Sequence, residues 1–351
     1  MRIGINALCL EPGYCGETVY LRNVFTRIRD LQPETRAIFV TSERNHGFFE
    51  GFDRAPFDGP VPPPQIGLPV AERDFARTLE TAEVDILFSP IQTAPAKCRV
   101  PLVLYAMDLQ FIVEPLARPR WRDKAIVKRV MQTCEAAAAI LAPSEFIRRQ
   151  LLELLEVPLD KVIVAPLGVS EVFAQPQACW VQKPFFLHVG ATRASKNIEG
   201  LLRAFDLFEN RTPHSLVMVG LPGDREQDDW GPRIMRIQQC PEHALAGLYQ
   251  HCDALVCASF YEGAGVTVLE GMRAGAQIVA GRVGAIPEFA GNAPIYCNAQ
   301  NAGTIAAAMQ RALEIEPDKR ERRAMYMTHA AAEFTWDKCA WKTLQAFRTR
   351  G

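Results

Sequence analysis

The chain is organised by short apolar runs that alternate with longer segments of helical periodicity. In the first half the runs cover residues 3–7, 37–41, 84–89, 102–106, 139–142 and 162–165. Each run is continuously apolar, which is typical of parallel strands covered on both faces. Helical segments are expected at 17–31, 70–81, 121–135 and 144–156. This order of strands and helices predicts an α/β fold built on a parallel sheet.

The same pattern restarts after segment 166–183, which has no clear periodicity and is expected to be a linker. Strands are predicted at 185–189, 215–219, 254–258, 277–280 and 295–297, and helices at 197–209, 243–251, 265–275, 302–314, 318–333 and 336–348. The length of 351 residues suits two domains. We therefore predict one domain over 1–168 and a second over 169–335, with 336–351 packing back on the first.

Composition narrows the class of function. The chain has 39 basic and 40 acidic residues, so it lacks the basic surplus that indicates nucleic-acid binding. No run approaches the roughly 20 apolar residues of a membrane span, and the first residues form a strand pattern without a signal-peptide layout, which predicts a cytoplasmic protein. Ten scattered cysteines without a C-x-x-C pair indicate reduced thiols, and six histidines without metal-ligand spacing predict no protein-bound metal.

The segment most informative about function follows the run at 254–258. It reads Ser-Phe-Tyr-Glu-Gly-Ala-Gly-Val-Thr-Val-Leu-Glu-Gly-Met over residues 259–272. In parallel sheets, ligands bind at the carboxyl ends of strands, and a helix that starts there offers unpaired N–H groups to a pyrophosphate. Glu262 precedes this helix and Glu270 lies about a turn and a half inside it, where their carboxylates can accept hydrogen bonds from sugar hydroxyls.

Two glutamates separated by seven intervening residues within this segment resemble the signature of glycosyltransferase family 4, whose members have the GT-B fold. Other segments resemble the family in the same order, at 142–145, 166–169, 185–197, 284–288 and 334–336. The loop at 11–18 is similar to the family's glycine loop, with Gly16 as the candidate residue. The resemblance covers most of the chain, densely after residue 139 and thinly before it.

The resemblance implies two Rossmann-like domains that face each other across a cleft. It also implies a retaining enzyme that moves a hexose-type sugar from a nucleoside diphosphate sugar of UDP or GDP type, without an obligatory metal. The donor would bind the C-terminal domain and the acceptor, a glycan, a lipid-linked sugar or a small molecule, the N-terminal domain.

Carried over to this sequence, the family pattern assigns roles to individual residues. Glu270 would hold the ribose hydroxyls and Glu262 the sugar hydroxyls near the reacting carbon. Lys196, with Arg193 of the preceding loop, would stabilise the charge that develops on the leaving diphosphate, the main catalytic role. Further contacts to the donor are implied for Gly16, Asp108, Gly190, Thr192, Gly263, Ala264, Gly265 and Val266.

Two positions depart from the family pattern. The family commonly has arginine directly after the loop glycine, where this chain has Ala191, which makes Arg193 the nearest candidate. A His-Asp pair often follows the fourth strand of the first domain, and the matching residues here are Met107 and Asp108. Asp108 therefore either contacts the donor or only caps a loop.

Alternative interpretations remain at this stage. Glutamates and glycine turns taken singly are more often structural, so the chain could be a non-catalytic GT-B subunit that binds nucleotide or a partner transferase. It could also be a GT-B epimerase acting on a sugar nucleotide. The basic run at 118–129 predicts either a solvated helix face or peripheral contact with an anionic membrane that carries a lipid-linked acceptor.

Overall fold

The computed structural model describes residues 1–8, 10, 16–59, 72–91, 94, 99–113, 121–190, 193–209, 212–220 and 231–350. The chain divides into two compact units, one formed by Met1–Gly168 with Trp336–Gly351 and the other by Val169–Thr335. We call them unit 1 and unit 2. The backbone therefore passes between the units twice, once after residue 168 and once after residue 335.

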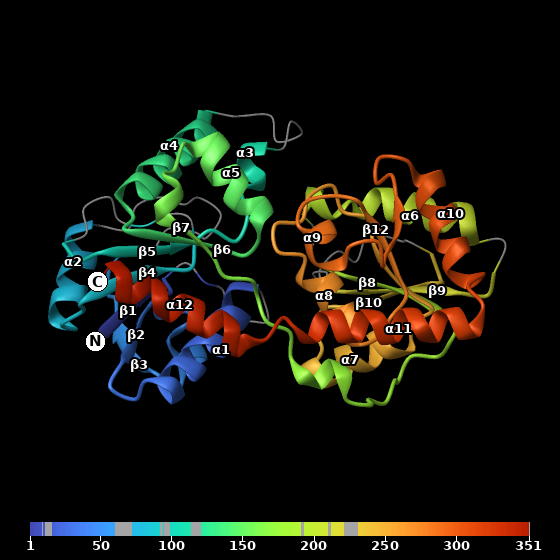
Figure 1. The fold of residues 1–351 in the computed structure, drawn as a ribbon, viewed down its shortest axis with the longest axis horizontal. Helices are drawn as coiled ribbons and strands as arrows, with labels where there is room; N and C mark the ends of the chain where they lie inside the picture. The colour runs from blue at the N-terminus through green and yellow to red at the C-terminus, as the bar shows by residue number, and fades with distance from the viewer. Residues whose placement is uncertain are drawn as a thin grey trace. The chain divides into compact units, whose positions relative to one another are not determined.

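Unit 1 contains a seven-stranded sheet in which every pair of neighbouring strands is parallel (Figure 1). The strand order is β3-β2-β1-β4-β5-β6-β7. The strands are β1 Arg2–Asn6, β2 Arg36–Thr41, β3 Asp53–Pro56, β4 Ile86–Ser89, β5 Leu102–Tyr105, β6 Ala139–Ala142 and β7 Val162–Val164. The helices are α1 Gly16–Leu31, α2 Glu72–Thr81, α3 Gln110–Val113, α4 Trp121–Ala136, α5 Glu145–Leu155 and α12 Trp336–Arg350, with short 3₁₀ turns at His46–Phe49 (η1) and Leu159–Lys161 (η2).

Unit 2 is built in the same way on a six-stranded parallel sheet of order β10-β9-β8-β11-β12-β13. Its strands are β8 Phe185–Val189, β9 Ser215–Val219, β10 Ile234–Ile237, β11 Ala254–Cys257, β12 Ile278–Gly281 and β13 Ile295–Cys297. The helices are α6 Ile198–Glu209, α7 Glu242–His251, α8 Val266–Arg273, α9 Ile286–Ala290, α10 Ala302–Leu313 and α11 Pro317–Ala332, with 3₁₀ turns at Glu171–Ala174 (η3) and Ala194–Lys196 (η4). The predicted α/β class with parallel sheets is confirmed.

The two strands that the sequence pattern missed, β3 and β10, are edge strands of their sheets. An edge strand has a neighbour on one side only, and neither β3 nor β10 contains a fully buried residue. Their sequences, Asp-Arg-Ala-Pro and Ile-Met-Arg-Ile, therefore lack the continuous apolar run of the central strands.

Helix boundaries follow local signals. Ser144 Oγ accepts a hydrogen bond of 3.1 Å from Ile147 N and caps the start of α5, which ends at Glu156 in the left-handed conformation. Asn301 caps α10 in the same manner by accepting from Thr304 N at 3.3 Å. These caps start α5 shortly after β6 and α10 shortly after β13.

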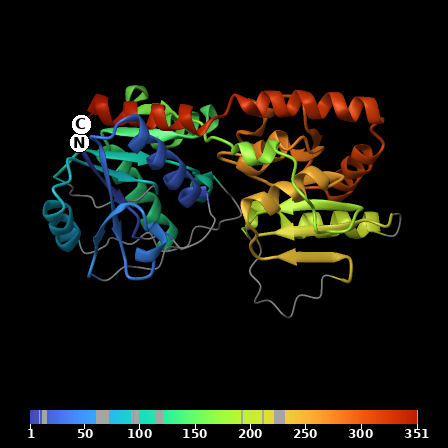
Figure 2. The same ribbon diagram turned by 90° about the horizontal axis from the view of Figure 1, so that it is seen from below.

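The last helix, α12, packs on α1 within unit 1 (Figure 1). Tyr20 Oη and Thr343 Oγ1 lie 2.8 Å apart in the buried contact, and the rings of Phe25 and Phe347 are 6.3 Å apart. Figure 2 shows the two ends of the chain side by side, as does Figure 1. The first and last segments of the chain therefore form one core.

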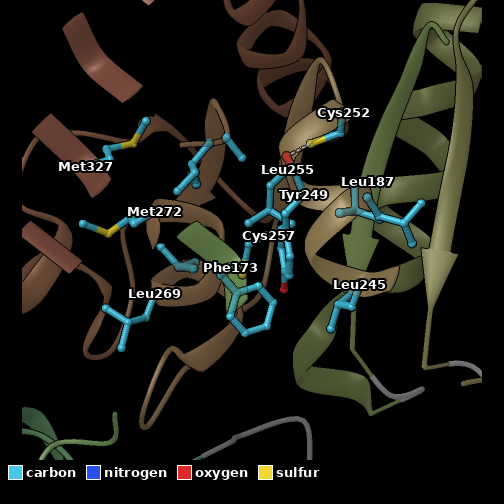
Figure 3. Close-up of a cluster of buried hydrophobic side chains, with 14 of the residues drawn as sticks. Phe173, Leu187, Leu245, Tyr249, Cys252, Leu255, Cys257, Leu269, Met272 and Met327 are labelled. Carbon is cyan, nitrogen blue, oxygen red and sulfur yellow. Dashed lines mark hydrogen bonds between the residues drawn. The ribbon is translucent and has the colours of Figure 1, made fainter. Parts of the chain in front are cut away.

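A cluster of buried apolar side chains in unit 2 joins β8, β11, α7 and α8 (Figure 3). Figure 3 shows Leu187 of β8, Leu255 of β11 and Met272 of α8 converging with Tyr249 of α7 and Phe173. These side chains are each less than 2% exposed. Close packing of this kind resists changes of even one methylene group, so α7 and α8 are held firmly against the sheet.

Candidate active site

The path of the loop between β11 and α8 depends on two glycines, Gly265 in the loop itself and Gly284 in the segment between β12 and α9 that packs against it. Gly265 is the N-cap of α8 with a φ of 60°, and a Cβ added there would lie 2.6 Å from Phe289 Cζ. Gly284 has a φ of 58° and packs directly on the backbone of Glu262, whose carbonyl accepts a hydrogen bond of 2.9 Å from Ala285 N. Only glycine combines a left-handed φ with so little space, so these residues fix the path of the loop.

Glu262 is buried and bound through one oxygen. Its Oε1 accepts hydrogen bonds from Lys196 Nζ at 2.7 Å and Ser259 Oγ at 2.7 Å, and from Cys257 Sγ at 3.6 Å. All the contacts with described residues fall on Oε1, which leaves Oε2 free to accept a further hydrogen bond. Burial alone would raise the pKa of Glu262, but the adjacent Lys196 outweighs it and lowers the pKa, so the group is ionised.

Lys196 lies at the end of η4, in the loop after β8. Its side chain is 19% exposed, and burial would lower its pKa, but Glu262 reverses this effect and raises the pKa. Arg193 is exposed at the N-cap of η4, and its charge lowers the pKa of Lys196, which shows that the two cations are near each other. The structure thus brings Lys196, Glu262 and Arg193 together from loops that are 66 residues apart in the sequence.

Asn197 joins these two loops. It adopts the left-handed conformation with a φ of 53°, and its Nδ2 donates to Ala258 O at 3.0 Å and to Ala299 O at 2.6 Å. Phe260 N also donates to Ser195 O at 2.7 Å. These bonds hold the Lys196 loop against the end of β11, so the ion pair sits on a rigid support.

Glu270 lies on α8 and is buried, with 6% of its surface exposed. Tyr249 Oη, from α7, donates to Glu270 Oε2 at 2.9 Å. Burial raises the pKa of Glu270 to about 8, and the hydrogen bond from Tyr249 lowers it only in part. Among the described residues, Glu262 has a cation beside it and Glu270 has none, so the two glutamates of one motif differ in charge.

His188 lies under the same loop. Its Nδ1 is 3.0 Å from Val256 O, and burial lowers its pKa to about 4, so the ring is neutral with Nδ1–H as the donor. A Cβ at Gly190 would lie 3.5 Å from Lys196 Cδ and 3.6 Å from His188 Nε2. The backbone of Gly190 therefore lies next to the side chains of both Lys196 and His188. Thr192 lies outside the described residues.

Three residues near the site were not expected from the sequence. Cys257 is the last residue of β11 and Ser259 lies two residues later, and both side chains donate to Glu262. Tyr249 donates to Glu270. Tyr249 belongs to an apolar helix face and has the pattern of a core residue, and its ring does lie in the core (Figure 3). Ser259 had a weak signal, since it is a small polar residue directly after a buried strand.

The candidate residues of unit 1 lie near one another. Gly16 is the first residue of α1, and a Cβ added to it would be 3.2 Å from Met107 Cε. Asp108, which follows Met107 in the sequence, accepts a hydrogen bond through Oδ1 from Gln110 N, the first residue of α3, at 3.2 Å, and so caps that helix. Capping accounts for this contact of Asp108, and residues 11–15 of the glycine loop lie outside the described residues.

In the described part of the chain, no group of three or more His, Cys, Asp or Glu side chains could hold a metal ion. No helix among the described residues is long and apolar enough to cross a membrane. The seven described cysteines are free thiols. In the basic run at 118–129, Lys128 is exposed, whereas Arg129 donates to Ala94 O at 2.9 Å; residues 118–120 and the side chains of 121–126 lie outside the described residues.

Comparison with known proteins identifies the family of the chain. The family model described as Glycosyltransferase Family 4 matches residues 19–172, and that described as Glycosyl transferases group 1 matches residues 173–329. The chain is 27% identical over 263 residues to the O-antigen chain mannosyltransferase B of Escherichia coli, a match that covers 69% of this chain and 68% of that protein.

Solved structures show the same fold. A sucrose-phosphate synthase from Thermosynechococcus elongatus superimposes with a TM-score of 0.80 at 16% identity, covering 99% of this chain and 98% of the other. The structure of Anabaena HepE in complex with UDP-glucose gives a TM-score of 0.77 at 14% identity, covering 99% and 100%. The protein is a glycosyltransferase with the GT-B fold and belongs to glycosyltransferase family 4.

Proposed function

We propose that this enzyme moves a hexose-type sugar, with retention at the anomeric carbon, from a nucleoside diphosphate sugar held by unit 2 to an acceptor held by unit 1. The acceptor is a glycan, a lipid-linked sugar or a small molecule. The buried Lys196–Glu262 pair carries the proposal. It combines a cation suited to a leaving diphosphate with a carboxylate oxygen that is free for a sugar hydroxyl.

The remaining roles follow from the positions of the groups. The backbone of Gly263, Ala264, Gly265 and Val266 leads into α8, whose N-terminal N–H groups favour a diphosphate. Glu270 lies further along the same helix and holds the ribose through the oxygen that Tyr249 does not occupy. No metal takes part, because Lys196 and Arg193 supply the positive charge.

Glu262 is a poor nucleophile, because the ion pair with Lys196 lowers the pKa, and so the basicity, of its carboxylate. We therefore favour a front-face mechanism, in which the acceptor hydroxyl attacks from the side on which the diphosphate leaves. Gly16 and Asp108 of unit 1 and Gly190 and Thr192 of unit 2 complete the donor contacts in this proposal.

The relatives suggest which donors to test first. The name of the Escherichia coli relative supports mannose as the transferred sugar, and the complex of HepE with UDP-glucose supports a UDP donor. GDP-mannose and UDP-glucose therefore represent the two donor classes.

The proposal is tested by thermal-shift titration of the protein with UDP, GDP, ADP, CMP and their common sugar conjugates. One diphosphate is expected to raise the melting temperature, because a ligand that binds only the native state stabilises it. The response should be lost in Glu270→Ala and kept in Glu316→Ala, which removes an exposed carboxylate of unit 2. No response to any nucleotide would contradict the donor site.

Two other functions are distinguished by turnover. A non-catalytic subunit would bind the nucleotide without transfer, and an epimerase would turn over a sugar nucleotide without an acceptor. The intact Lys196–Glu262 pair favours transfer over the first of these alternatives.

The proposal places the reaction in the cytoplasm, with peripheral contact of the basic run at 118–129 at an anionic membrane surface. Of its described side chains, exposed Lys128 suits this role, whereas Arg129 donates to Ala94 O. Replacing the basic residues of the run by glutamine should reduce flotation with vesicles containing roughly 30% phosphatidylglycerol, which supplies the negative surface potential of an anionic membrane. Unchanged flotation would remove the membrane contact.

A further inference from the structure

Unit 1 contains a hollow of about 760 Å³ at the ends of β2 and β3. Its walls come from the segment after β2, from η1 and from the segment after β3. These are the carboxyl ends of parallel strands, where α/β sheets bind ligands. The volume falls in the range of roughly 300–1,000 Å³ that is typical of small-molecule sites.

The charged side chains that line this hollow are exposed and have no partner among the described residues. The side chains of Glu43 and Arg44, after β2, and of Asp58, after β3, form no hydrogen bond or ion pair with the described residues. His46 is held by one ring nitrogen, since its Nδ1 lies 2.8 Å from Thr41 Oγ1, which leaves Nε2 available. Two carboxylates, one guanidinium and one imidazole nitrogen therefore line the hollow without partners among the described residues.

The wall that carries these groups is rigid. Asn45 is 1% exposed, and its Nδ2 donates to Ala7 O at 2.7 Å and to Leu10 O at 2.8 Å. Its Oδ1 accepts from Ser42 N at 3.0 Å. The segment after β2 is thus tied to the segment after β1. A wall ordered before binding lowers the entropic cost of binding a ligand.

The charges indicate the class of ligand. Two carboxylates against one guanidinium repel a phosphate but accept hydrogen bonds from hydroxyl groups, while Arg44 and His46 can donate to them. We propose that this hollow binds the sugar rings of a neutral glycan acceptor. The inference rests on the proposed function and deepens it by assigning the acceptor class and Glu43, Asp58, Arg44 and His46 as its contacts.

Binding of an α-linked mannobiose to the full-length protein, without donor, tests the inference by saturation-transfer NMR. Glu43→Gln/Asp58→Asn should weaken binding at least tenfold, because hydrogen bonds to charged groups are among the stronger ones. The control, Glu34→Gln/Glu50→Gln, removes the same charge from exposed positions outside the hollow and should bind as the native protein does.

The same variants are then compared in the transfer assay with the donor identified by thermal shift. The KM for mannobiose should rise at least tenfold in Glu43→Gln/Asp58→Asn, while the thermal shift caused by the donor stays unchanged. An unchanged KM, or equal mannobiose binding by all three proteins, would overturn the inference and leave the donor site intact.

Two further results would also overturn it. One is failure of the native protein to bind mannobiose, maltose and cellobiose alike. The other is tighter binding of mannose 6-phosphate than of mannose, which would indicate an anion site. Failure of the proposed function itself would be recognised separately, as the absence of any thermal shift with nucleotides.

Discussion

At the scale of single residues, the Lys196–Glu262 pair is where stability and catalysis depend on the same contact. Lys196→Met leaves a buried carboxylate beside Ser259 without its cation. Loss of one partner of a buried pair costs about 3–5 kcal/mol of unfolding free energy, because the remaining charge is uncompensated. We expect that loss in urea denaturation at pH 7, together with a transfer rate reduced at least about 100-fold.

The double variant Lys196→Met/Glu262→Gln separates the two effects. It removes both charges, so it should recover most of the stability while remaining inactive. The folded-state pKa of Glu262 is lowered, so the pair contributes stability above the unfolded pKa of about 4.5 and loses it as the pH falls through the folded value. If Lys196→Met were as stable as the native protein at pH 7, this account of the pair would be wrong.

Glu270 is expected to show the opposite pH dependence. Its folded pKa is about 8 and its ordinary value 4.5, so between these values the unfolded chain ionises while the folded protein keeps the proton. The unfolded state is then favoured increasingly as the pH rises from about 4.5 to 8. Glu270→Gln should therefore gain stability relative to the native protein between pH 5 and pH 8, by at least about 1 kcal/mol.

The measurement is the difference in unfolding free energy between the two proteins at pH 5 and at pH 8. Glu316→Gln, at an exposed position, serves as the control and should show a constant difference. A constant difference for Glu270→Gln as well would mean that Glu270 is already ionised at pH 5. Nucleotide binding should in addition release a proton near pH 7, because ribose hydroxyls stabilise the carboxylate.

At the scale of elements, the start of α8 depends on Gly265. Gly265→Ala adds both the strain of a φ of 60° and an overlap with Phe289 Cζ at 2.6 Å. Replacing Phe289 by alanine removes the ring that the added Cβ would meet, so Gly265→Ala in the Phe289→Ala background reports the strain alone. We expect Gly265→Ala to cost about 1 kcal/mol in that background and about 2–4 kcal/mol in the native protein, measured by urea denaturation. Equal losses would show that the Phe289 ring moves aside freely.

Helices and strands could be predicted from the sequence where burial or backbone conformation alone requires a particular residue pattern. The buried central strands need continuous apolar runs, and all of these runs are strands in the structure. The turn before α8 carries its glycines in the sequence. Strands β3 and β10 were not predictable, because their pairing depends on the neighbouring strand and not on their own side chains.

At the scale of the whole molecule, α12 closes the fold by returning to α1 in unit 1. Thr343 Oγ1 donates to Cys339 O at 2.9 Å, so its single hydroxyl proton is used and Tyr20 must donate in the 2.8 Å contact between them. Thr343→Val leaves the buried Tyr20 hydroxyl without an acceptor, whereas Tyr20→Phe removes only the donor. We expect the first to cost about 1–3 kcal/mol and the second about 0.5–1.5 kcal/mol of unfolding free energy. The reverse order would contradict this donor assignment.

The sequence by itself determined the α/β class, the family and the short segments that carry the site, because each depends on local composition and spacing. Glu262, Lys196 and Glu270 could all be named from their motifs. The tertiary structure alone decided that Lys196 and Glu262 share one hydrogen bond across 66 residues, and that Glu270 lies buried against Tyr249 with no cation beside it in the described part of the chain. These properties depend on distance and burial in the folded chain, which is why two glutamates from one motif differ in their charge.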